Sequence, residues 1–73
     1  MILEVGATLV TAQRYDEGIR LFRLANKISA EPSIDDPVIF VRSLELEANT
    51  YFVMGDNISA KNILLRFFST DEK

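Results

Sequence analysis

The apolar residues of this chain recur at helical spacing in four separate stretches. At the start, Ile2, Val5 and Leu9 follow one another at intervals of three and four residues, which places them on one face of a helix. The segment 37–41 is rich in residues that favour strands, but the apolar positions after it keep the helical period. The pattern therefore predicts an all-α fold with helices at about 2–13, 16–28, 37–54 and 58–68.

Residues with special capping or backbone roles mark the helix ends. Asp36 precedes Pro37, a typical helix start, because the carboxylate accepts an orphan amide while proline fits the first helical position. Gly55 is expected to end that helix in a left-handed conformation. Either Asp56 or Asn57 is expected to cap the next helix.

A linker divides the chain into two helical pairs. The segment 29–36 contains a proline, three acidic residues and two serines, a composition typical of a connection. We expect one domain over 1–73. It consists of a first unit at about 1–28, the linker, a second unit at about 37–68 and a polar tail at 69–73.

The two units are similar when residue i is aligned with residue i + 42. Small residues and large residues then coincide: Gly6 with Ala48, Gly18 with Ala60, and Phe22 with Leu64. Small residues are needed where two helices approach closely, and large ones fill the spaces between helices. The repeat predicts that each unit is an antiparallel helical hairpin.

The repeated unit resembles the tetratricopeptide repeat. Residues 15–25 begin with an aromatic at the turn, Tyr15, followed by the small Gly18, the large Phe22 and an alanine, an order similar to the second helix of that family. Residues 49–60 are similar to the end of a first helix, a Gly-Asp turn and the start of a second helix. The family period is about 34 residues, so the linker or a longer third helix would absorb the difference.

The resemblance implies where a ligand would bind. Tetratricopeptide proteins commonly hold their ligand in a groove lined by the first helix of each repeat. The matching positions of this chain are Leu3, Ala7, Val10, Arg42, Glu45, Asn49 and Phe52. This set is more apolar than charged and suits the apolar stripe of an amphipathic helix. The alternative is that Leu3, Val10 and Phe52 pack between the hairpins.

Composition and charge exclude several classes of function. The 73 residues include no cysteine and no histidine, which excludes a thiol nucleophile, a Ser/His/Asp triad and a Cys/His zinc site. Glu45 and Glu47 diverge on a helix and cannot act as an acid and base pair. A net charge of -3 argues against nonspecific nucleic-acid binding, and no apolar run approaches the roughly 20 residues of a membrane span. We expect a cytoplasmic protein that is not an enzyme and uses no cofactor or metal.

The small size predicts dependence on a partner. Two hairpins fall short of the three or so repeats that close a repeat core, so the apolar residues of the last helix are expected to contact another chain. These residues are Ile63, Phe67 and Phe68. We therefore predict an interaction module that forms hetero-oligomers with small helical proteins by burying an amphipathic helix.

Among proteins of this size, the chain is similar to the helper chaperones of bacterial type III secretion, which shield the needle subunit in the cytoplasm. Four alternatives stay open. The chain is a homodimerisation module, it is part of a larger tetratricopeptide scaffold, its two hairpins fold on each other and hide their own apolar residues, or its four helices form an arrangement unrelated to that repeat.

Overall fold

The computed structural model describes the backbone of residues 2–68 and the side chains of residues 2–67, and it is all-helical over that range. The predicted all-α fold is confirmed. The helices in this range are α1 (Ile2–Thr11), α2 (Tyr15–Ser29), α3 (Pro37–Met54) and α4 (Asn57–Phe68). The predicted polar tail at 69–73 lies outside the described residues.

The first helix ends two residues before its predicted end. Gln13 adopts a φ of 65°, and its amide donates to the carbonyl of Val10 at 2.9 Å. The next amide, that of Arg14, donates to the carbonyl of Leu9 at 2.8 Å. A left-handed residue at this place turns the chain out of the helix while the last carbonyls keep their partners.

The ends of the later helices follow the predicted chemistry. The carboxylate of Asp36 accepts the amide of Ile39 at 3.1 Å, and Gly55 ends α3 with a φ of 85°. Asp56 is the cap of α4, because its carboxylate accepts both the amide of Ser59 at 3.1 Å and the hydroxyl of Ser59 at 2.7 Å. The bond from the hydroxyl, followed by the bond from the amide, lowers the pKa of Asp56 below its usual value.

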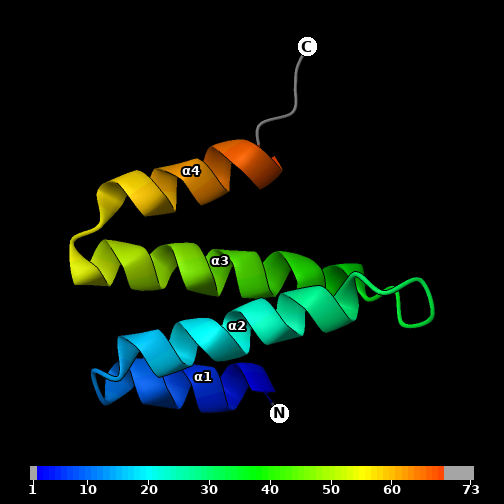
Figure 1. Ribbon diagram of the computed structural model, residues 1–73, viewed down its shortest axis with the longest axis horizontal. Helices are drawn as coiled ribbons and strands as arrows, with labels where there is room; N and C mark the ends of the chain where they lie inside the picture. Colours follow the sequence, from blue (N-terminus) through cyan, green and yellow to red (C-terminus); the bar gives the residue numbers. More distant parts are fainter. Residues whose placement is uncertain (1, 69–73) are drawn as a thin grey trace.

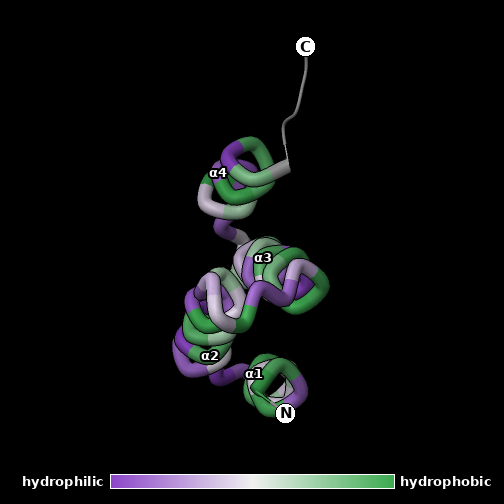
Figure 2. Tube along the Cα trace, turned by 90° about the vertical axis from the view of Figure 1, so that its right-hand side faces the viewer, coloured by the Kyte–Doolittle hydropathy of each residue, from purple (hydrophilic) through white to green (hydrophobic). Residues whose placement is uncertain are grey.

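The four helices of the described range form a single row rather than a closed bundle. Figure 1 shows them in chain order, with α1 at one edge and α4 at the other. The Cα trace measures 37 × 29 × 13 Å, and Figure 2 shows α2 displaced to one side of α1 and α3. Each helix packs mainly on its neighbours in sequence, and no Cα of α2 lies within 8 Å of one in α4. The two hairpins therefore do not close around a common centre.

The closest approach in this row joins α1 to α2. A Cβ placed on Gly6 would lie 2.6 Å from Cε1 of Phe22, and one placed on Gly18 would lie 2.7 Å from Cγ2 of Val10. Phe22 is only 1% exposed. It forms the core with Leu3 and Ala25, and four half-buried side chains pack against that core: Ile2, Val10, Ile39 and Leu46.

The second hairpin has the same kind of contact. Ala48 and Ala60, the counterparts of Gly6 and Gly18, are both buried. Leu64, the counterpart of Phe22, is instead 37% exposed. Within the described residues α3 continues the row after α2, whereas no further helix follows α4.

A larger side chain at Gly18 is expected to break the first hairpin. Gly18→Leu would push against Val10 and also against the carbonyl oxygen of Gly6, which lies 3.0 Å from the added Cβ and cannot rotate away. We expect the free energy of unfolding to fall by about 2 kcal/mol or more, measured by urea denaturation. Ala7→Leu, at an exposed position of α1, is the control and should change it by less than about 0.5 kcal/mol. Equal stability of the two variants would contradict the proposed close approach.

Candidate functional site

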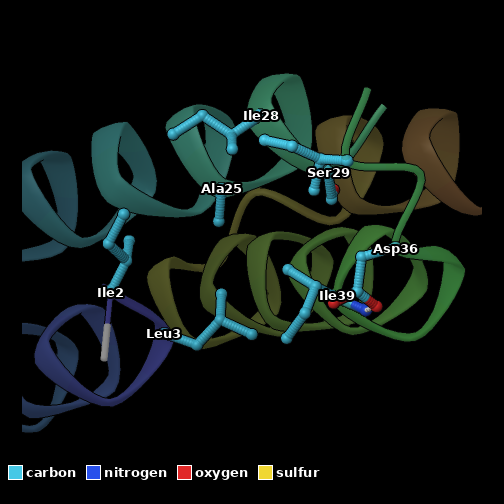
Figure 3. A pocket seen from close by; sticks show the side chains of 8 residues that line it. Ile2, Leu3, Ala25, Ile28, Ser29, Asp36 and Ile39 are labelled. Carbon is cyan, nitrogen blue, oxygen red and sulfur yellow. Dashed lines mark hydrogen bonds between the residues drawn. The ribbon is translucent and has the colours of Figure 1, made fainter. Parts of the chain in front are cut away.

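An apolar groove lies between α1 and α3, with α2 as its floor. It encloses about 180 Å³ and is shown in Figure 3. Its lining consists of Ile2, Leu3, Ala25, Ile28, Ser29, Ile34, Asp36 and Ile39. We call these eight residues the apolar groove.

The two polar side chains of the apolar groove are already engaged by the backbone. The hydroxyl of Ser29 donates to the carbonyl of Asn26 at 3.0 Å, and Asp36 caps α3 through the amide of Ile39. Ile28 and Ile34 remain 37% and 52% exposed at the rim. A cavity of about 150 Å³ with apolar walls is known to hold a benzene molecule, so this groove has room for one large apolar side chain.

The structure brings together the predicted ligand residues of α3. Arg42, Glu45, Asn49 and Phe52 are all exposed on one helix face, and neither α2 nor α4 covers that face. Two apolar residues share it: Val38 is 74% exposed and Val41 is 40% exposed. This face, which we call the open face of α3, combines apolar and polar groups.

The predicted ligand residues of α1 have different environments. Ala7 is exposed, whereas Val10 is half-buried because it packs across Gly18. Leu3 is only 7% exposed and belongs to the core with Phe22. Leu3 therefore lines the α1 side of the apolar groove and offers little surface of its own to a partner.

The predicted contact residues of α4 are partly covered by α3. The ring of Phe67 meets that of Phe40 edge to face, with centroids 6.2 Å apart and planes at 76°, yet Phe67 is still 43% exposed. Ile63 is half-buried. The side chain of Phe68 lies outside the described residues.

A second, polar cleft lies between α2 and α4, with α3 as its floor. It encloses about 370 Å³ and is lined by Arg23, Asn26, Leu44, Glu47, Tyr51, Ser59, Asn62, Ile63, Arg66 and Phe67. The sequence did not predict this cleft, and Arg23 had the pattern of an ordinary solvated residue. Its partner in the cleft, Glu47, is 24 residues away, and no local motif connects the two.

The centre of the polar cleft is an ion pair across the junction of the two hairpins. Nε of Arg23 donates to Oε2 of Glu47 at 2.9 Å, and Nη2 of Arg23 donates to the hydroxyl of Tyr51 at 2.7 Å. The bond to Glu47 is the main reason that the pKa of Arg23 is raised above its usual value. The Glu47 side chain is 8% exposed, whereas that of Arg23 is 64% exposed. The pair is therefore asymmetric, because only the carboxylate has lost its contact with water.

The described residues show neither a membrane span nor a metal-binding cluster. None of the helices within 2–68 is long and apolar enough to cross a bilayer. In the same range, no cluster of three or more carboxylates is placed to hold a metal ion. No protein-family model matches the chain, and neither a curated protein nor a solved structure matches it.

The asymmetry of the ion pair predicts unequal costs for its two halves. Arg23→Met leaves a buried carboxylate without its donor, and we expect a loss of about 2 kcal/mol in the free energy of unfolding. Glu47→Gln keeps an acceptor for Arg23 and leaves the guanidinium in solvent, so its cost should stay below about 1 kcal/mol. Urea denaturation at pH 7 measures both. A larger loss for Glu47→Gln than for Arg23→Met would contradict the asymmetry.

Proposed function

We propose that this protein is a non-enzymatic interaction module that buries the apolar face of an amphipathic helix from another protein. The observation that carries the proposal is the apolar groove between α1 and α3. It opens to solvent, it has room for one large side chain, and both of its polar side chains are engaged by the backbone. Such a site favours an apolar side chain over a polar one, because it offers a polar group no replacement for its lost water.

The open face of α3 supports a helix rather than a single small ligand. A docked helix presents apolar residues at positions i, i+3, i+4 and i+7, which needs a surface longer than one pocket. Val38 and Val41 provide apolar contacts on α3, whereas Arg42, Glu45 and Asn49 provide polar groups that can set the direction of the partner.

Burial on binding would also stabilise the module itself. A domain of 73 residues buries only about 60% of the surface that its unfolded chain exposes, and the row arrangement leaves large apolar side chains in water on several helices. Covering the side chains of Ile28 and Ile34 would contribute about 1 kcal/mol each. A partner that binds only the folded form raises stability by mass action.

The narrower proposal is a small cytoplasmic chaperone of type III secretion for a needle-type subunit. It is supported by the resemblance of the sequence to tetratricopeptide repeats. A subunit that polymerises through an amphipathic helix needs that surface covered before export, and the apolar groove offers a suitable cover. The same groove would serve equally well in a larger tetratricopeptide scaffold.

The first test is binding of a model helix. The probe is a fluorescent 18-residue amphipathic peptide with leucines at i, i+3, i+4 and i+7, and a scrambled peptide of the same composition is its control. We expect the helical peptide alone to bind. Ile28→Lys combined with Ile34→Asp should weaken binding at least about tenfold at unchanged net charge, because both changes put charge at the rim of the groove.

The matched control is Val5→Lys combined with Leu65→Asp. It makes the same two kinds of change at exposed positions outside the groove and should leave the affinity for the peptide unchanged. Equal binding by the groove variant and the wild type would overturn the proposal. Co-expression with a needle-type subunit, followed by mass determination of the complex, tests the narrower proposal. A well-folded monomer that leaves such subunits unbound would overturn it.

A second variant separates the open face of α3 from the core. Phe52 is 47% exposed, so Phe52→Glu should weaken peptide binding while the circular dichroism spectrum keeps its helical content. Loss of helicity in this variant would show that Phe52 supports the fold instead.

A further inference from the structure

The two edges of the helix row have faces that no helix in the described range covers. Figure 1 places α1 and α4 at opposite edges of the row. On α1, Val5 is 52% exposed, and on α4, Leu65 is 55% exposed and Leu64 is 37% exposed. The corresponding surfaces inside the molecule are those that meet where α2 packs on α3.

The 42-residue repeat relates the residues of that junction to residues at the two edges. Three polar residues correspond to three apolar ones: Arg23 to Leu65, Glu47 to Val5 and Tyr51 to Leu9. At the internal junction, Arg23 contacts both of its partners, Glu47 at 2.9 Å and Tyr51 at 2.7 Å. The three hydrogen-bonded residues of the internal junction thus correspond to three apolar residues, one on α4 and two on α1.

This replacement keeps the two edges complementary to each other. A change of Arg23 to leucine alone would leave the buried carboxylate of Glu47 without a donor. A change of Glu47 to valine alone would leave Arg23 without its carboxylate partner. The corresponding residues at both edges are apolar, so that a leucine on α4 would meet a valine and a leucine on α1. Contacts between apolar side chains are favourable wherever they remove surface from water.

We propose that α4 of one copy packs on α1 of a second copy in the way that α2 packs on α3 within one copy. The occupant of the α4 edge is a second copy, because the counterparts of the two partners of Arg23 are Val5 and Leu9, which this chain carries on α1. The two faces differ, so the contact is heterologous and each added copy presents a new free edge. This association does not depend on the apolar groove and is separate from the binding of a partner helix.

Sedimentation experiments on the edge variants test this contact. The weight-average mass of the wild type should rise with concentration, whereas Val5→Asp and Leu65→Asp should each remain at 8.3 kDa. An equimolar mixture of the two variants should form a complex of two copies and stop there. In that mixture, the intact α1 face of Leu65→Asp binds the intact α4 face of Val5→Asp, and the remaining edges are blocked.

Both variants carry the same added charge, so attraction between the substituted residues cannot produce the complex in the mixture. Val38→Asp is the control, because Val38 is 74% exposed on α3 and lies at neither edge. It should associate like the wild type, and so should the groove variant Ile28→Lys with Ile34→Asp. Circular dichroism confirms that each variant is folded.

Two outcomes would overturn the proposal. A wild type that stays at 8.3 kDa up to about 1 mM has no such contact, and its edges are then covered by another protein or by other segments of a longer chain. A wild type that associates while the mixed variants stay monomeric uses a symmetric contact, because only a contact between two different faces can be restored by mixing.

Discussion

The structure depends on the close approach of α1 and α2 at their two glycines. The ring of Phe22 lies against Gly6 where a Cβ has no room, and Val10 lies against Gly18 in the same way. Phe22 is 1% exposed, and Ile39 and Leu46 of α3 pack against the core that it forms. One aromatic side chain therefore connects three of the helices, and the absence of side chains at Gly6 and Gly18 makes the close approach of α1 and α2 possible.

The row arrangement follows from this mode of packing. In a closed bundle all of the helices surround a common core. Here α2 and α4 both pack on α3 but do not approach each other. A row of helices has two open faces and two open edges. The apolar groove and the polar cleft lie on different sides of α2 and α3, and the exposed faces of Val5 and Leu65 lie at the edges.

The junction between the hairpins is held differently from the hairpins themselves. Within the first hairpin the contact is apolar and depends on small residues. Between α2 and α3, an apolar side that includes Ile39 is joined by a polar side on which Arg23 bonds Glu47 and Tyr51. Ion pairs of this kind contribute modestly to stability, but they define which surfaces fit together because a wrong partner leaves a charge unpaired. The apolar groove and the polar cleft lie on either side of this junction.

The sequence by itself determined the helices and their ends. Helical periodicity, the Asp36 and Pro37 start and the Gly55 end depend on residues close together in the chain. The small residues that mark the hairpin contact were visible in the 42-residue repeat. The early end of α1 depended on the left-handed conformation of Gln13, a residue type that only occasionally adopts it.

Tertiary structure alone decided what covers each helix face. Helical phase places Leu3 and Val10 on one face of α1, but only the packing on Phe22 shows that Leu3 is buried while Ala7 stays exposed. The phase of α2 likewise left Arg23 as a solvated residue, because its partner Glu47 lies 24 residues away. Local spacing specifies which residues share a face, and the arrangement of the helices in space specifies what that face meets.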